Sequence, residues 1–160
     1  MSKLRKVKRY SETDDRQTSI DLCQKIVDYF KPSGIILEPC KGDGNFLKVL
    51  PIDSEWCEIK ENRNFFDYNN KVNWIITNPP WSLFGEFLKH SLEISNHIVF
   101  IAAFHYIGTK KRLKMLKDLQ FWIKDILLVE TPISWGGWGF QLVCFHFEKF
   151  YSGNTYIGYL

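Results

Sequence analysis

The sequence of 160 residues lacks the marks of membrane-spanning and secreted proteins. It has no run of the roughly 18 apolar residues that a membrane-spanning helix requires. Its charged N-terminus is followed by the polar segment SETDDRQTS rather than by the apolar stretch of a signal peptide. We therefore expect neither a membrane span nor a secretion signal, and we expect the protein to be cytoplasmic.

Cysteine is scarce and scattered along the chain. The four cysteines, Cys23, Cys40, Cys57 and Cys144, form no CxxC pair and no cluster with histidine. This spacing argues against both a disulfide framework and a structural zinc site, so we predict no metal. We interpret Cys40 as a packed small residue rather than as a nucleophile.

The sequence also has no internal repeat, no low-complexity tract and no linker rich in Gly, Ser or Pro. An apolar fraction of 45%, with 13 Phe, 7 Tyr and 6 Trp, is enough for a packed core and excludes a disordered chain. At this length we expect a single domain over residues 15–160, preceded by a flexible basic arm over residues 1–14.

The net charge of +3 is small but unevenly distributed. The first ten residues contain five of the 21 bases and no acid, which leaves 16 bases against 18 acids in residues 11–160. These five are Lys3, Arg5, Lys6, Lys8 and Arg9. A basic arm on a nearly neutral body is typical of proteins with a polyanionic partner, and also of an ordinary solvated terminus.

Strand patterns alternate with helix patterns through the first two thirds of the chain. Helical spacing predicts helices over residues 20–30, 46–50, 83–94 and 109–116. Short β-branched or aromatic runs predict strands over residues 34–37, 55–59, 73–77, 97–103, 121–130 and 140–147. The alternation indicates an α/β fold: a doubly wound, mostly parallel sheet with an antiparallel strand pair at the C-terminal end.

An unusual turn, EPCKGDG over residues 38–44, follows the first predicted strand. Gly42 and Gly44 let the backbone turn sharply and let a ligand approach main-chain N–H groups. Leu47 stands where a dinucleotide fingerprint needs its third glycine, which disfavours a nicotinamide or flavin dinucleotide. Glu58 closes the second strand, where an acid commonly binds ribose hydroxyls. An ordinary turn with two surface acids is the structural alternative.

A second unusual turn follows the third predicted strand and consists of Asn78, Pro79, Pro80 and Trp81. Two prolines fix the backbone and remove two N–H donors, so the turn presents acceptors rigidly beside a flat ring. Such a corner suits a planar substrate that bears an NH₂ group. The alternative is an ordinary Pro-Pro turn at the end of a strand, with no role in binding a substrate.

Together the two turns carry a family resemblance. ILEPCKGDGNF resembles the S-adenosylmethionine-binding motif of class I amino-methyltransferases. IITNPPW resembles the (D/N/S)PP(Y/F/W) motif of enzymes that methylate exocyclic amines, in particular DNA adenine-N6 methyltransferases. The order of the motifs and their separation also match that family. The resemblance implies a Rossmann-like seven-stranded sheet, S-adenosyl-L-methionine as cofactor, and methyl transfer to adenine N6 in DNA.

The same resemblance implies roles for individual residues. The implied cofactor contacts are Glu38, Pro39, Gly42, Gly44, Phe46, Glu58, Ile59 and either Asn64 or Asp67. Among these, Glu58 would bind the ribose, Ile59 would contact the adenine, and Asn64 or Asp67 would meet the adenine amine. At the catalytic turn of residues 78–81, the Asn78 side-chain oxygen and the Pro79 carbonyl would accept hydrogen bonds from the target NH₂. Trp81 would stack on the extruded base.

Further candidates for holding nucleic acid lie late in the chain. They are His105, Lys110, Lys111, Arg112, Trp135 and Trp138. His105 follows a central strand, the bases could track phosphates, and the two tryptophans could stack on nucleotides. The tryptophan loop would alternatively cap the core.

We expect a nucleic-acid partner, DNA rather than RNA. No insertion is large enough for a separate target-recognition region. We therefore expect low sequence specificity, a very short recognition site, or a second copy or partner subunit that supplies the recognition. The alternatives are methylation of an RNA amine or of a protein glutamine, and a non-catalytic nucleic-acid-binding subunit of a heteromeric methyltransferase.

Overall fold

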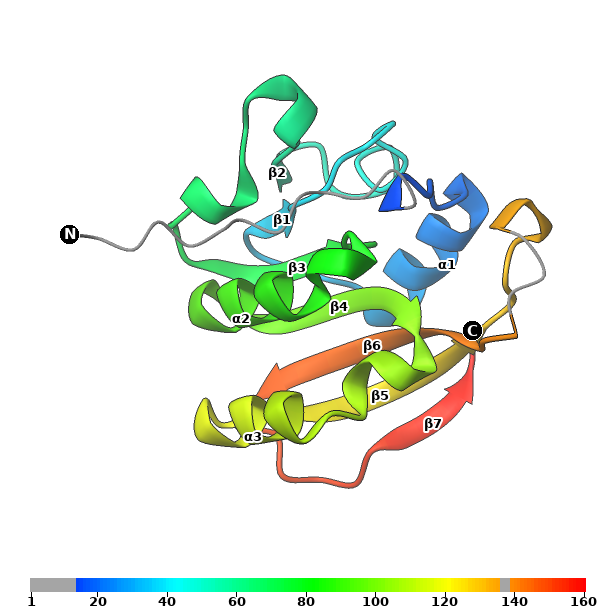
Figure 1. Cartoon of the computed structure of the whole chain (residues 1–160). Coiled ribbons are helices and arrows are strands. Elements are labelled where there is room, and N and C mark those ends of the chain that lie inside the picture. Colours follow the sequence, from blue (N-terminus) through cyan, green and yellow to red (C-terminus); the bar gives the residue numbers. More distant parts are fainter. Residues whose placement is uncertain (1–13, 136–138) are drawn as a thin grey trace.

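The computed structural model describes residues 14–135 and 139–160. Its strands are β1 (Ile36–Glu38), β2 (Glu55–Trp56), β3 (Val72–Thr77), β4 (Ser95–Ala103), β5 (Phe121–Val129), β6 (Leu142–Lys149) and β7 (Tyr156–Tyr159). They form one seven-stranded sheet in the order β2-β1-β3-β4-β6-β5-β7 (Figure 1). Within the described residues β6 runs antiparallel to its neighbours β4 and β5, and the other pairs are parallel. The predicted α/β sheet with an antiparallel C-terminal region is confirmed.

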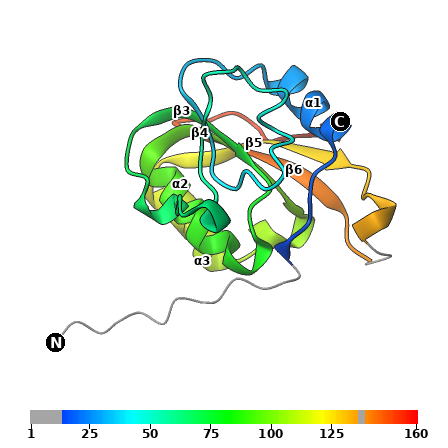
Figure 2. The ribbon, with the colours of Figure 1, turned by 90° about the horizontal axis from the view of Figure 1, so that it is seen from above.

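Helices cover both faces of the sheet. Helix α1 (Ile20–Phe30) lies on one face, and α2 (Phe84–Ile94) and α3 (Lys110–Asp118) lie on the other (Figure 2). Successive residues of the central strands point to opposite faces, as strand geometry requires. Ile76 therefore joins the core cluster under α1, and Ile75 joins the cluster under α2. The sheet is doubly wound, as predicted.

The predicted helix over residues 20–30 has those bounds in the structure. Ser19 caps it, because its side chain accepts a hydrogen bond from the Leu22 N–H at 3.3 Å. Lys31, in a left-handed conformation just before Pro32, ends the helix. The helices expected over residues 83–94 and 109–116 correspond to α2 and α3.

Two expected elements are wrong or shortened. The predicted helix over residues 46–50 is a series of hydrogen-bonded turns, in which the Leu50 N–H donates to the Phe46 carbonyl at 2.9 Å. Five residues before Pro51 are too few to sustain a helix, although Phe46 and Leu50 are buried under α1. The predicted strand over residues 55–59 stops at Trp56, and residues 59–61 form a 3₁₀ helix.

Strand β7 has no counterpart in the sequence patterns we identified. It pairs in parallel with β5, at the edge of the sheet, and three of its four residues are exposed. An exposed edge strand lacks the apolar alternation by which a half-buried strand is predicted. In the part of the chain that the structure describes, no helix is both long and apolar enough to cross a membrane.

Candidate functional site

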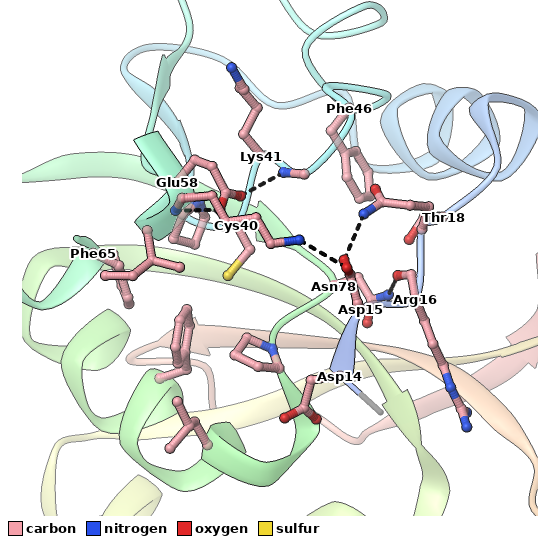
Figure 3. Close-up of a pocket in the computed structure, with 18 of the residues that line it drawn as sticks. Asp14, Asp15, Arg16, Thr18, Cys40, Lys41, Phe46, Glu58, Phe65 and Asn78 are labelled. Atoms are coloured by element: carbon pink, nitrogen blue, oxygen red, sulfur yellow. Dashed lines mark hydrogen bonds and ion pairs between the residues drawn. The ribbon is translucent and has the colours of Figure 1, made fainter. Parts of the chain in front are cut away.

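A cavity of about 480 Å³ opens where β1 and β3 end, at the carboxyl edge of the sheet. Its volume is in the range of small-molecule sites. Many of the predicted site residues line it: Pro39, Gly42, Phe46, Glu58, Ile59, Asn64, Asn78 and Pro80. The structure thus brings residues of the EPCKGDG turn and of the turn at residues 78–81 to one cavity (Figure 3).

Glu58 ties the first turn together. Its Oε2 accepts a hydrogen bond from the Gly42 N–H at 2.9 Å, and its Oε1 accepts one from the Lys60 N–H at 3.0 Å. Gly42 has φ of 51°, and a Cβ at this position would lie 2.5 Å from the Gln17 Oε1 atom. A glycine at this point therefore gives the turn its conformation and leaves room for Gln17.

Glu38 lies beneath the first turn and is not among the residues that line the cavity. It is 1% exposed, and its Oε1 accepts a hydrogen bond from the Cys40 N–H at 2.9 Å. Burial raises the pKa of Glu38 to about 8, although the Thr77 side chain and the Cys40 amide oppose the shift. Glu38 thus supports the turn from below, and its expected contact with a cofactor stays a prediction.

The two candidates for the cofactor's adenine amine are separated by the structure. Asn64 lines the cavity and caps a 3₁₀ helix (Phe65–Asp67), since its Oδ1 accepts the Phe66 N–H at 3.2 Å. Asp67 lies at the other end of that helix, outside the lining. Gly44, also expected at the cofactor, has φ of 77° and likewise stands outside the lining.

Asn78 enters the cavity from the end of β3 with its carboxamide fixed on both sides (Figure 3). Its Nδ2 donates to the Arg16 carbonyl at 2.9 Å, and its Oδ1 accepts from Trp81 Nε1 at 3.3 Å. An amide oxygen has two lone pairs, so Oδ1 keeps one acceptor position beyond the bond to Trp81. The hydrogen bonds define which end of the amide is oxygen.

Trp81 is packed beside the cavity and is not part of its lining. The Arg16 guanidinium lies 5.3 Å from the centre of its ring, and Phe140 and Trp135 meet the ring edge-on. Its Nε1 also donates to the Ile101 carbonyl at 3.2 Å. A base that stacked on Trp81 at the Arg16 side would have to displace the guanidinium. Pro79 also lies outside the lining.

Residues 14–18, here called the covering segment, also line the cavity and were missed by sequence reasoning. Asp14, which we placed in the basic arm, accepts hydrogen bonds from the backbone N–H of Ser82 at 3.0 Å and from its hydroxyl at 2.5 Å. Asp15 forms an ion pair with Lys60 at 2.9 Å. These two acids hold the segment to residues beyond each turn, and the Arg16 carbonyl accepts a hydrogen bond from Asn78 of the second turn itself.

The other end of the covering segment contacts the residues that follow Gly42. The Gln17 side-chain oxygen accepts the Asp43 N–H at 3.2 Å, and Asn45 donates to the Thr18 carbonyl at 2.8 Å. The one signal in the sequence was a polar stretch directly before α1, which alone indicates only a helix start.

One wall of the cavity is apolar. It is formed by Ile59, Phe65, Phe66, Leu83 and Phe87. Phe65 and Phe87 pack with ring centres 5.0 Å apart. Helical spacing indicated a buried position for Phe87, but no sequence pattern distinguished the side of either ring that faces the cavity, and both residues are buried.

Cys40 also lines the cavity. Burial, reinforced by the nearby carboxylates of Glu38 and Glu58, raises the pKa of its thiol well above the usual value. The thiol is therefore protonated at neutral pH and is a poor nucleophile. This agrees with our interpretation of Cys40 as a packed residue.

The candidates for nucleic-acid contact do not line the cavity. His105, Lys110 and Lys111 are exposed beyond the carboxyl end of β4. Arg112 donates to the Tyr106 carbonyl, and its guanidinium lies 5.1 Å from the Phe84 ring centre, so its charge is engaged within the fold.

The tryptophan loop gives a mixed outcome. Trp135 is 6% exposed and belongs to the core cluster under α1, which corrects its expected role in stacking on nucleotides. The ring caps the core instead, as the structural alternative had it. Trp138 and the basic residues 3–9 lie outside the described residues.

Comparison with known proteins finds likeness in structure alone. No protein-family model and no curated protein matches the chain. A putative RNA methyltransferase from Pyrococcus horikoshii matches with a TM-score of 0.61 at 12% identity, over 90% of this chain and 93% of that one. The M protein of the type I restriction enzyme EcoKI matches with a TM-score of 0.63 at 15% identity.

The match to the EcoKI M protein covers 87% of this chain but only 45% of that protein. A putative class I S-adenosylmethionine-dependent methyltransferase from Listeria monocytogenes matches with a TM-score of 0.57 at 10% identity, over 94% of this chain and 65% of that one. At such low identity these likenesses establish that the chain has the fold of these proteins.

Proposed function

We propose that the chain is an S-adenosylmethionine-dependent methyltransferase that transfers a methyl group to the exocyclic N6 amine of adenine in DNA. The observation that carries this proposal is the fixed carboxamide of Asn78, which lines the same cavity as Gly42 and Glu58. The fold is shared with proteins described as methyltransferases.

The charges that line the cavity suit the cofactor. Three acids (Asp14, Asp15, Glu58) and three bases (Arg16, Lys41, Lys60) are among its lining residues, which suits a ligand that carries an ammonium, a carboxylate and a sulfonium. Gly42, whose φ is 51°, has no Cβ, and one at this position would lie 2.5 Å from the Oε1 atom of Gln17, another residue of the lining. When bound, this cofactor supplies an electrophilic methyl group.

Each part of the cavity has a role in holding the cofactor. Glu58 binds the ribose hydroxyls with the lone pairs that remain beyond its bonds to Gly42 and Lys60. Asn64 meets the adenine amine, and the apolar wall at Ile59 covers the adenine ring. Gly42 and Pro39 border the methionine end.

At the catalytic turn, the chain acts on the target amine by hydrogen bonding. The Asn78 Oδ1 atom and the Pro79 carbonyl accept the two N–H bonds of the amine. Two acceptors favour a nitrogen whose lone pair is directed at the methyl group, and they stabilise the positive charge that builds up during transfer. The reaction needs no protein nucleophile, which agrees with the raised thiol pKa of Cys40.

A labelling experiment tests the proposal. The purified chain is incubated with methyl-labelled S-adenosylmethionine and unmethylated DNA, and the DNA is digested to nucleosides. Label in N6-methyladenine is the expected result, and absence of label from N6-methyladenine with every DNA sequence used would refute the assignment. A partner subunit or second copy is proposed to supply target recognition, so several DNA sequences are used.

RNA is the second candidate substrate. It is favoured by the likeness to the putative RNA methyltransferase, because that match covers nearly the whole of both chains. The same experiment with unmodified RNA distinguishes the two substrates. Label in RNA but not in DNA would identify RNA as the substrate. A chain that binds no cofactor in calorimetry would instead be a non-catalytic subunit.

A further inference from the structure

A second polar cluster lies at the amino ends of β3 and β4, away from the cavity. His97 of β4 is paired with Glu148 of β6 in the register of the two strands. His146 stands two residues before Glu148, so both point to the same face of the sheet. That face is the one covered by α1, because the ring centres of His146 and Phe30 are 5.1 Å apart.

Three atoms of this cluster that could bind a metal ion lie close together. His97 Nδ1 lies 3.3 Å from His146 Nε2 and 3.8 Å from Glu148 Oε2, and His146 Nε2 lies 3.9 Å from the same carboxylate oxygen. A triangle with these sides has a point about 2.1 Å from every corner, which is the distance at which zinc binds imidazole nitrogen and carboxylate oxygen.

Asp125 orients the central histidine. Its Oδ2 lies 2.8 Å from His146 Nδ1, so that nitrogen donates to the carboxylate and Nε2 is left with its lone pair toward His97 and Glu148. Histidines that bind metals in proteins are commonly held by a carboxylate in this way. A bulge between Ile123 and Asp125 pairs Asp125 with His146, where regular pairing would bring residue 124 opposite.

The cluster is sheltered but reachable. The His146 side chain is 3% exposed, whereas those of His97 and Glu148 are 30% and 21% exposed. Trp74 stacks on His97 with ring centres 4.3 Å apart and limits the movement of that ring. An ion bound by the three residues would keep access to solvent on one side, where water can complete its coordination.

We propose that His97, His146 and Glu148 form a binding site for a divalent ion of the zinc type, with Asp125 as the residue that positions His146. The site joins β4 to β6 and is separate from the methyltransferase cavity. Sequence spacing did not predict it, because its ligands are 49 and 51 positions apart from His97 and only the sheet brings them together.

Lys124 makes the proposal more specific. Its Nζ lies 2.8 Å from Glu148 Oε2, the atom assigned to the ion. The ammonium and the ion therefore compete for one carboxylate oxygen, and removal of the ammonium should strengthen metal binding.

Calorimetry with zinc chloride, on the full chain freed of metal with a chelator, tests the site. We expect one ion per chain. His97→Ala should weaken binding at least about tenfold, while the control His105→Ala, at an exposed histidine outside the cluster, should leave it unchanged. Absence of binding to the unaltered chain, or equal binding by both variants, would overturn the proposal.

Two further variants keep the test independent of folding. Lys124→Met should tighten zinc binding several-fold, whereas Lys89→Met, at an exposed position of α2, should not. If His97→Ala unfolds, Glu148→Gln replaces it with the same expected loss. Equal affinities for Lys124→Met and Lys89→Met would contradict the assignment of Glu148 Oε2 as a ligand.

Discussion

The two turns that contribute to the cavity are held in different ways. The first turn is held through its backbone, since a glycine with positive φ donates its N–H to the carboxylate of Glu58. The catalytic turn has a backbone fixed by two prolines, and a side chain, that of Asn78, is what its neighbours hold. The difference predicts a division of labour: the first turn governs cofactor binding, and the second governs transfer.

Substitution of the catalytic amide should have the largest effect. Asn78→Ala removes the oxygen that accepts the target amine, so the rate of transfer should fall on the order of 10²–10³-fold, as for loss of one group that stabilises charge in a transition state. Cofactor affinity should stay within a few-fold by calorimetry. Asn154→Ala, in an exposed turn far along the chain, is the control. An equal fall in the transfer rate and in the cofactor affinity would contradict the assignment of separate roles to the two turns.

Glu58→Gln should have the converse effect. The variant keeps the size of the side chain but loses the negative charge that strengthens its hydrogen bonds to the Gly42 and Lys60 N–H groups. A hydrogen bond to a charged group contributes about 1.5–3 kcal/mol to stability. We expect the cofactor dissociation constant to rise roughly tenfold, with the saturated rate nearly unchanged. Glu86→Gln, exposed on α2, serves as control. A saturated rate that fell as far as the affinity would contradict this prediction.

The covering segment joins the two turns, and its substitution should weaken both functions modestly. Asp14→Ala removes the acceptor of the Ser82 N–H and hydroxyl, which should lower the free energy of unfolding by about 1 kcal/mol, a typical net contribution of a hydrogen bond. Transfer rate and cofactor affinity should each fall a few-fold. Chemical denaturation and steady-state kinetics measure the effect, with Asp53→Ala as an exposed control. A fall in only one of the two quantities, the transfer rate or the cofactor affinity, would argue against a role of the covering segment in both.

The last prediction concerns stability rather than activity, at Glu38, which supports the first turn without lining the cavity. Its folded pKa of about 8 exceeds the ordinary value of 4.5, so the folded state binds the proton more tightly. The free energy of unfolding should therefore fall as the pH rises from about 4.5 to 8, and should level off above that. Glu38→Gln should reduce this decline in urea denaturation at several pH values. An unchanged pH profile would show that Glu38 is ionised in the folded protein.

The sequence predicted most of the fold because its central elements repeat apolar residues with a clear period. The bounds of α1 and the strands β3 to β6 follow from such periods. The edge strand β7 is exposed and carries no such signal, and the turns at residues 46–50 are set by packing of Phe46 and Leu50 under α1.

In the site, the residues that sequence reasoning found are those whose local chemistry is unusual. Pro39, Gly42, Asn78 and Pro80, which line the cavity, fall in this class. The covering segment was missed because its contacts join residues far apart in the sequence, such as Asp14 with Ser82. The burial of Glu38 and Trp135 depends on the packed core, which no local pattern reports.

A crystal structure of the chain with bound S-adenosylmethionine tests the central claim most directly. We predict that the ribose hydroxyls bind Glu58, that the adenine packs against Ile59, and that the methyl group is directed toward Asn78. A cofactor bound elsewhere, or with its methyl group turned away from Asn78, would contradict the account.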